Sequence, residues 1–457
     1  MPDYDQRAGI NSAAGAPRRS TPIRRRSVLR GLAFGAVAGP ALIETLAACG
    51  SQTPGGVPVS SKPPASSGAP AVSSSGSGSS PAATAGGLQI ASPDNPVTWP
   101  IYDDNPVIDD NLQPEKNAVL RLYNYADYID PGAIKAFEKK YQAFNVKVQL
   151  STFNDTDEAL TKIRTGKVPY DIYFPSYDQI SKMVTAKLIR PLNHSYIPNI
   201  KNVWPEFTNP WYDLGWQYSV PYTVYTTGIG WRTDKVKQDP SQRPNPYDAF
   251  WDDSSSRVAV IDDWHTCMAM VLLREGKGAQ INSTDPAVLA DVQKGLLAMQ
   301  AATHPKVTIT MYNDLPAGQL SLCQMWSGDV VNAVSYLPKG VKPSVLGYWF
   351  PEDGRGAVDN DLNVILKGGK NPVLAHLFLN HMLDTKTALG NFSYIGYQPP
   401  QNSLDIDAVV SDGYLPANLS AAVVKREYFT EGYRLLELPP AADAAWHQVW
   451  TRFKAGA

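Results

Sequence analysis

The segment LYNYADYIDPGAIKAF, Leu122 to Phe137, predicts a β-strand that runs directly into an α-helix. Its first residues have the composition of a strand, and Asp130 followed by Pro131 is a helix-start signal. The junction carries three tyrosines and a carboxylate within six residues: Tyr123, Tyr125, Asp127 and Tyr128. A strand-to-helix turn needs neither this much aromatic surface nor this charge, so the junction is a candidate functional region.

Strand and helix patterns alternate outward from this segment. Residues 145–153, NVKVQLSTF, alternate as a strand, and residues 155–167, DTDEALTKIRTGK, predict a helix that ends at Gly166. Residues 171–176, DIYFPS, predict a short buried strand. The order strand, helix, strand, helix, strand predicts a largely parallel sheet with helices on both faces.

The same pattern returns in the second half of the chain. Residues 256–262, SRVAVID, predict a strand, and two helices follow, the second of them beginning after Asp285. Residues 361–369, DLNVILKGG, predict a further strand, and Asn371 is expected to cap the helix that starts at Pro372. Two α/β lobes fit a chain of 457 residues.

The N-terminal part of the chain has a different chemistry. RRRSVLR at residues 24–30 precedes an apolar run from Gly31 to Leu46, which is typical of an export signal and, through its paired arginines, of the twin-arginine route. The run is short for a membrane span. The LAAC motif ending at Cys49 resembles the lipobox of bacterial lipoproteins, in which the cysteine is lipidated. A chance match to so short a motif is the alternative.

These features predict two segments before the globular part. Residues 1–48 are expected to be a twin-arginine or general secretory signal of a lipoprotein. Residues 49–98 consist mainly of Ser, Gly, Pro and Ala, and they have too few large apolar residues to offset the entropy of ordering. They are expected to form a disordered tether.

Composition and charge limit the function classes. The chain is 43% hydrophobic and 18% charged, as in globular proteins. Loss of residues 1–48 would remove seven Arg and three acidic residues, which leaves 34 basic and 40 acidic side chains and a net charge of −6. No basic patch indicates nucleic acid binding, and the modest acidity is compatible with a cationic ligand.

The chain has two further cysteines, Cys267 and Cys323. In an exported protein they could form a disulfide. Alternatively, they are two small buried apolar residues. The sequence leaves both possibilities open because it does not determine the distance between them.

Carboxylates and aromatic rings recur after the predicted strands, where α/β sheets bind their ligands. They are Tyr125, Asp127, Tyr128, Tyr177, Asp178, Asp262, Asp263, Trp264, Trp326, Asp329, Asp359, Asp361 and Tyr397. Aromatic faces attract cations and cover methylene groups, and carboxylates bind ammonium groups. The mixture therefore fits an aliphatic polyamine. Solvated surface acids, core aromatics and a helix cap at Asp262 or Asp263 are the alternative interpretation.

Seven segments in order also resemble a known family. They are LRLYNYADYIDPGAIKAFEKKY, YDIYFPSYDQISKM, QYSVPYTVYTTGIGW, VAVIDDW, QMWSGD, DNDLNVI and YIGYQPP. They resemble the spermidine/putrescine-binding proteins of polyamine ABC transporters, which are periplasmic binding proteins, over most of residues 118–457. The resemblance implies an α/β fold of two lobes, each a mostly parallel sheet flanked by helices, that are joined by crossing strands and close over the ligand.

The resemblance also implies lobe boundaries and site residues. The lobes are expected at residues 99–229 with 360–401 and at residues 230–359 with 402–457, with crossing strands near residues 222–231, 359–362 and Gln401. The implied ligand-binding residues are Tyr125, Asp127, Tyr128, Tyr177, Asp263, Trp326, Asp361 and Tyr397. The chain departs from the family at Thr266, where an acid is usual, and at Asp359, where a tryptophan is usual.

The expected function is therefore transport without catalysis, metal or cofactor. A monomer, lipid-anchored at the outer face of the cell membrane, would capture putrescine or spermidine and deliver it to the permease subunits of an ABC transporter. One alternative is a binding protein for another cation, such as a quaternary ammonium or an amino acid. A weaker one is a secreted hydrolase that uses Asp262, Asp263 and His265, or His376 and His381. A surface adhesin is the last alternative.

Overall fold

The computed structural model describes residues 84–85, 88–252 and 257–456. The expected signal, the candidate lipidation site Cys49 and most of the expected tether lie outside these residues. The folded part begins earlier than the expected boundary at Trp99. Val97 is buried, its N–H donates to the carbonyl oxygen of Trp211 at 2.9 Å, and its own carbonyl accepts from the N–H of Leu214 at 2.9 Å.

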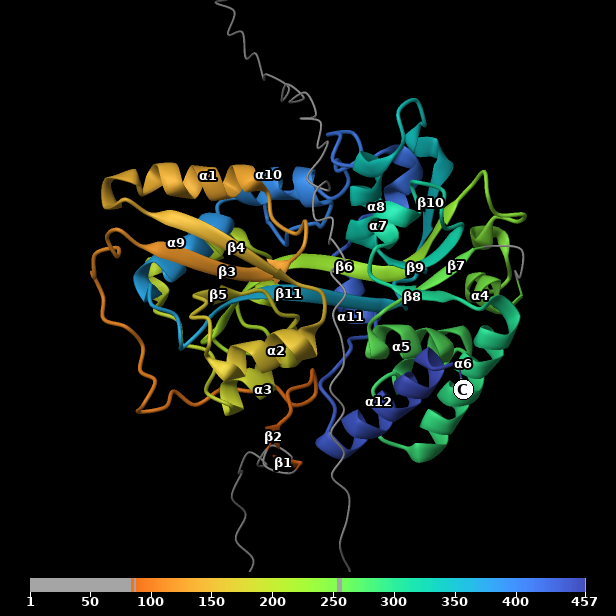
Figure 1. The fold of residues 1–457 in the computed structure, drawn as a ribbon, viewed down its shortest axis with the longest axis horizontal. Helices are drawn as coiled ribbons and strands as arrows, with labels where there is room; N and C mark the ends of the chain where they lie inside the picture. The colour runs from red at the N-terminus through yellow and green to blue at the C-terminus, as the bar shows by residue number, and fades with distance from the viewer. Residues whose placement is uncertain (1–83, 86–87, 253–256, 457) are drawn as a thin grey trace, which may run out of the picture. The chain divides into compact units, whose positions relative to one another are not determined.

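Nine strands of the described chain form one sheet (Figure 1). Along the sheet they are β4 (Lys147–Phe153), β3 (Val119–Tyr125), β5 (Ile172–Tyr173), β11 (Ala357–Ile365), β6 (Ser219–Arg232), β9 (Leu322–Trp326), β7 (Val258–Ile261) and β8 (Lys306–Thr308), while β10 (Leu346–Trp349) pairs with β6. A separate hairpin joins β1 (Thr84–Ala85) to β2 (Leu88–Gln89). Parallel pairs occupy both ends of the sheet, β3 with β4 and β5 at one end and β7 with β8 and β9 at the other.

Two long antiparallel strands, β6 and β11, join the parallel ends. Strand β6 is buried over its whole length and pairs with β11 through its first part and with β9 through its last part. The pairing of β11 with β6 shifts register between Asp361 and Leu362. Such a β-bulge redirects the side chains beside it. The crossing strands therefore carry an irregularity at the carboxylate that the resemblance places in the binding site.

Helices cover both faces of the sheet. In Figure 1, α1 (Pro131–Lys140), α8 (Ser327–Ala333) and α10 (Thr385–Ile395) lie above it, and α2 (Thr156–Thr165), α3 (Ile180–Thr185), α5 (Trp264–Arg274) and α12 (Pro440–Lys454) lie below it. The remaining α-helices are α4 (Ala249–Asp252), α6 (Pro286–Thr303), α7 (Met311–Asp314), α9 (Pro372–Met382) and α11 (Tyr428–Glu431). Within the described ranges, each helix is either too short or too polar to span a lipid bilayer.

Local capping signals explain where several helices begin and end. Asp130 accepts a hydrogen bond from the N–H of Gly132 and caps α1, and Asp285 caps α6 through the N–H of Ala287. Gly166 ends α2 in the left-handed conformation that glycine adopts without steric cost. These predictions from the sequence are confirmed.

The capping role expected of Asn371 is wrong. Its side chain does not bond to the first turn of α9; its amide group donates instead to Val119 O and to an oxygen of Asp171, both at 3.0 Å. Glu115, which is distant in the sequence, accepts from the free N–H groups of Val373 and Leu374 at 2.9 Å. A carboxylate is the better acceptor at a helix N-terminus because of the helix dipole.

Cys267 and Cys323 are both free and fully buried. They serve as small apolar residues in the core, which is the second of the two possibilities that the sequence left open. Burial raises the pKa of both thiols well above the usual value, so neither is a reactive thiolate at neutral pH.

Candidate functional site

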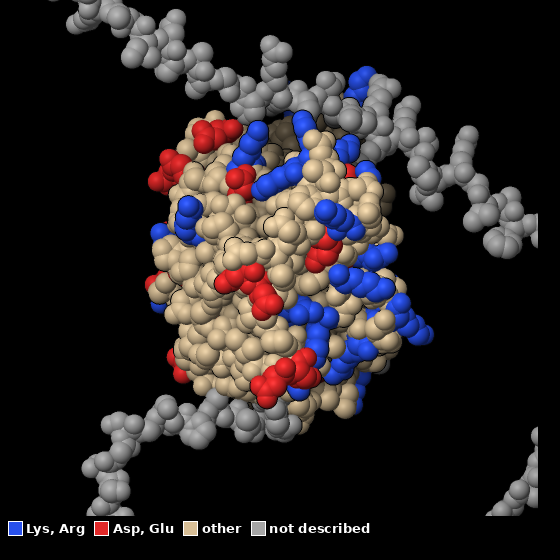
Figure 2. All heavy atoms as spheres, turned by 90° about the vertical axis from the view of Figure 1, so that its left-hand side faces the viewer, with Lys and Arg blue, Asp and Glu red and all other residues tan. Residues whose placement is uncertain are grey.

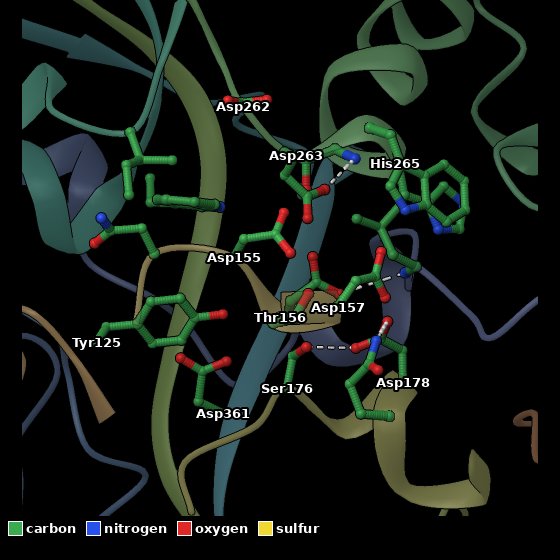
Figure 3. A pocket seen from close by; sticks show the side chains of 18 of the residues that line it. Tyr125, Asp155, Thr156, Asp157, Ser176, Asp178, Asp262, Asp263, His265 and Asp361 are labelled. Atoms are coloured by element: carbon green, nitrogen blue, oxygen red, sulfur yellow. Dashed lines mark hydrogen bonds between the residues drawn. The ribbon is translucent and has the colours of Figure 1, made fainter. Parts of the chain in front are cut away.

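One cavity of about 360 Å³ gathers all eight predicted site residues, of which Tyr125, Asp263 and Asp361 are labelled in Figure 3. Its lining includes Tyr125, Asp127, Tyr128, Tyr177, Asp263, Trp326, Asp361 and Tyr397. Seven of them come from β3, β9, β11 and the segments that follow strands, as expected for an α/β sheet, whereas Tyr397 follows the helix α10. A cavity of this size suits a small ligand.

The cavity is strongly acidic, and we call it the acidic cavity. Its eleven carboxyl groups belong to Asp127, Asp155, Asp157, Asp178, Asp262, Asp263, Asp329, Asp359, Asp361, Glu437 and Asp443, whereas only Lys182 and Lys454 contribute ammonium groups. By contrast, Figure 2 shows both basic and acidic side chains on one outer face of the molecule. The negative charge is therefore concentrated in the acidic cavity, although the whole chain is nearly neutral.

Asp361 lies on the bulged strand β11 and is buried. The hydroxyl of Tyr128 donates to its Oδ2 at 2.7 Å, and the hydroxyl of Tyr225 donates to its Oδ1 at 3.1 Å. Burial raises the pKa of Asp361 to about 7, although both hydrogen bonds act to lower it. The carboxyl thus receives hydroxyl groups but, among the described residues, no ion pair, and a cation beside it would favour its charged form.

Asp329 forms a second buried carboxyl in the first turn of α8. Tyr397 donates to its Oδ1 at 2.8 Å, and its Oδ2 is buried without a hydrogen-bond partner in the described chain. Burial raises the pKa of Asp329 to about 7. The residue was among the strand-end acids but not among the predicted site residues. The signal that marks it is an acid in the first helical turn directly after a strand.

A glycine places the ring of Tyr397 against α8. A Cβ atom at Gly328 would lie 2.2 Å from Cγ and Cδ2 of Tyr397, which is far inside van der Waals contact. We expect Gly328→Ala to displace that ring and to lower the free energy of unfolding by about 1–3 kcal/mol, the usual cost of overpacking, in urea denaturation.

Gly390 in α10 supplies the matched control. It is exposed, and a Cβ atom there meets nothing within 4 Å. Gly390→Ala should therefore raise the free energy of unfolding by up to about 1 kcal/mol, because alanine favours the helix. A Gly328→Ala protein as stable as the Gly390→Ala protein would contradict the assigned contact.

Aromatic rings surround Asp361 and Asp329, the two carboxyls whose pKa is raised to about 7. The ring centroid of Tyr128 lies 4.7 Å from that of Tyr397 and 5.9 Å from that of Tyr125, both edge to face. Tyr225 lies 6.3 Å from Trp326 in the same manner. Burial raises the pKa of Tyr125, Tyr128 and Tyr225 well above the usual value, so the rings remain neutral. The walls can cover methylene groups and attract a cation.

Asp359, at the position where the resemblance implied a tryptophan, already has a cation beside it. Its Oδ1 lies 3.9 Å from Nε of Arg434 and accepts from the hydroxyl of Tyr177 at 2.8 Å. The Arg434 guanidinium lies over the ring of Tyr177, 4.2 Å from its centroid. Burial raises the pKa of Asp359 to about 6, and the charge of Arg434 opposes that rise. Because the charge of Arg434 offsets it, Asp359 adds less negative charge to the acidic cavity than an unpaired carboxylate would.

Two other predicted acids have structural partners as well. Asp263 accepts a hydrogen bond from the N–H of Thr266 at 2.8 Å and caps α5. It also lines the acidic cavity, so it both caps the helix and faces the candidate site. Burial raises the pKa of Asp263. Asp127 has a positive φ of 54°, and its Oδ2 accepts from the hydroxyl of Tyr336 at 3.2 Å. This strained backbone turns the junction after β3 toward the acidic cavity.

The residues of the hydrolase alternative do not form a catalytic group. Asp262 pairs with Lys454 at 2.7 Å, whereas Nε2 of His265 lies 2.9 Å from the carbonyl oxygen of Ile281. His376 and His381 likewise bond to backbone groups. Among the residues that the structure describes, no set of three or more His, Cys, Asp or Glu side chains is placed to hold a metal ion.

Fold and cavity together have the form expected of solute-binding proteins: two parallel-stranded regions joined by long crossing strands, and a cavity lined from both regions. The chain belongs to the family of bacterial extracellular solute-binding proteins, whose model matches residues 132–421. Members of this family are components of transporters and not enzymes. The two-lobe α/β fold that the resemblance implied is thereby confirmed.

Individual relatives agree with this assignment. The spermidine/putrescine-binding periplasmic protein 1 of Haemophilus influenzae is 27% identical over 283 residues, which cover 62% of this chain and 75% of the relative. The putrescine-binding periplasmic protein PotF of Escherichia coli K12 is 26% identical over 351 residues, 74% of this chain and 91% of the relative. The solved spermidine/putrescine substrate-binding protein PotD of Streptococcus pneumoniae has a TM-score of 0.59 at 26% identity, over 74% of this chain and 99% of that one.

Proposed function

We propose that this protein captures a linear polyamine outside the cytoplasm and presents it to the permease of an ABC transporter. The observation that carries the proposal is the pair of buried carboxyls Asp361 and Asp329, which lie among tyrosine rings in the acidic cavity. An alkyl chain with ammonium groups matches both parts of this lining. The relatives named for putrescine and spermidine support the same ligand class.

The chemistry favours this class over a quaternary ammonium. A quaternary ammonium has no N–H group and is held mainly by aromatic faces. Primary ammonium groups donate up to three hydrogen bonds each and need several acceptors when they are buried. Oδ2 of Asp329, which has no hydrogen-bond partner within the described ranges, is such an acceptor, and the eleven carboxyl groups exceed what an aromatic cage requires.

The two-lobe architecture supports closure over the ligand and delivery of it to a permease. The eight predicted residues would contact the ligand, and the long strands β6 and β11 would act as the hinge between lobes with the boundaries given above. The ligand favours closure by as much as it prefers the closed form. Lipidation at Cys49 and the tether would hold this monomer at the outer face of the membrane, within reach of the permease subunits.

Calorimetric titration of the purified protein tests the proposal. Putrescine, spermidine, spermine, glycine betaine and arginine are titrated separately at low and high salt. We expect micromolar or tighter binding of a linear amine, weakened by salt because charge pairing contributes to it. Binding of glycine betaine alone, or silence toward every amine from a folded sample, would refute the proposal.

A further inference from the structure

Lys182 on α3 carries an ammonium group at one end of the acidic cavity. Its Nζ lies 3.4 Å from Oδ1 of Asp443 and 4.0 Å from Oε1 of Glu437. The Glu437 side chain is 2% exposed. Burial raises the pKa of Glu437 to about 8, while the charge of Lys182 and a hydrogen bond with the side chain of Ser181 act to lower it. Lys182 is therefore a cation that favours the charged form of this deeply buried carboxyl.

The neighbouring acids have partners of their own. Asp178 accepts from the hydroxyl of Ser176 at 2.5 Å and from the amide of Gln179 at 2.9 Å. Nε2 of His447 lies 3.8 Å from Oδ2 of Asp157 and 3.7 Å from Oδ2 of Asp443. Glu437, together with Oδ1 of Asp443, would therefore accept a further ammonium if the side chain of Lys182 were absent.

A lysine side chain is itself a four-carbon alkyl chain that ends in an ammonium, which is one end of a polyamine in chemical terms. We propose that Lys182 acts as a built-in substitute for a ligand ammonium and sets the length of the amine that the acidic cavity accepts. Its ammonium group takes the place that a ligand ammonium would have beside the carboxyls of Glu437 and Asp443. A bound amine then places its ammonium groups toward Asp361 and Asp329, and the protein favours a diamine over a longer triamine. This inference rests on the proposed function.

The charges around Lys182 are consistent with this role. Burial acts to lower the pKa of Lys182, but the surrounding carboxyls outweigh it and hold that pKa above the usual value. The ammonium is therefore charged at neutral pH. An additional ligand ammonium at this end would meet a like charge in a partly buried environment, where screening by water is weak.

The test compares putrescine and spermidine affinities in matched variants. Lys182→Met keeps the length of the side chain and removes its charge, and we expect it to raise the affinity for spermidine relative to putrescine at least tenfold. Lys277→Met removes the same charge outside the acidic cavity, where Lys277 pairs with Asp291 at 3.1 Å, and should change that ratio less than twofold. Adding Glu437→Gln to Lys182→Met should abolish most of the gain, because the acceptor carboxyl is lost.

The outcomes separate this inference from the proposed function. Wild-type protein that binds neither amine overturns both. Wild-type protein that binds putrescine, with an unchanged ratio in Lys182→Met, overturns only the role of Lys182. An equal change of ratio in Lys277→Met also overturns it, because it would show a general effect of charge. If Lys182→Met does not fold, as judged by thermal unfolding, Lys182→Gln replaces it with the same expected result.

Discussion

Replacing Asp361 with asparagine is expected to weaken polyamine binding more than tenfold while the protein stays folded. The carboxylate would make a charge-assisted bond to a ligand ammonium, and the neutral amide makes only an ordinary one. The amide can still accept a hydroxyl hydrogen bond from Tyr128 or Tyr225, so the local packing is retained. Calorimetric titration with the preferred amine measures the loss, and thermal unfolding verifies the fold.

A matched control for this variant is Asp285→Asn. Asp285 caps α6 and does not line the acidic cavity, and asparagine caps helices as well as aspartate does. This variant should bind the amine with unchanged affinity. Equal affinities of the Asp361→Asn and wild-type proteins would remove Asp361 from the binding site.

Amine affinity is expected to fall by more than about tenfold between pH 8 and pH 5.5. Burial raises the pKa of Asp361 and of Asp329 to about 7, so both carboxyls of the ligand-free protein are largely protonated at pH 5.5 and charged at pH 8. The alkyl ammonium groups stay charged over this range. Binding requires the charged carboxylates, so it must release protons below pH 8. Titrations in buffers of different ionisation enthalpy measure that release directly.

The stability of the ligand-free protein should change in the opposite direction. In the unfolded chain these acids ionise near their ordinary values of about 4. Because the pKa of these carboxyls is higher in the folded state, the folded state binds more protons than the unfolded state between about pH 4 and pH 7. The stability that this proton binding provides is lost as the pH rises through the pKa values of the folded state. Glu437, whose pKa burial raises to about 8, extends this window upward. Thermal midpoints without and with saturating amine measure both effects. A pH-independent affinity would contradict the buried, proton-binding state of these carboxyls.

Much of the site was predictable because strand ends gather at one edge of an α/β sheet. Tyr125 and Trp326 are the last residues of β3 and β9, Asp263 follows β7, and each lines the acidic cavity. Tyr225 and Lys182 were not predicted. Tyr225 lies within a fully buried strand, where a tyrosine has the ordinary interpretation of a core residue, and Lys182 lies on a short helix whose direction the sequence does not give.

The sequence by itself determined the order of strands and helices, the caps at Asp130 and Asp285, and the chemistry of the strand ends. These features depend on hydrogen bonds and side-chain periodicity within a few residues, so local sequence is sufficient. Only the tertiary structure decided that Glu115 caps α9 in place of Asn371, that Arg434 neutralises Asp359, and that both cysteines stay free. Each of these outcomes depends on which distant segments pack together. The pKa of a buried carboxyl likewise depends on the charges and hydrogen-bond donors that packing places beside it.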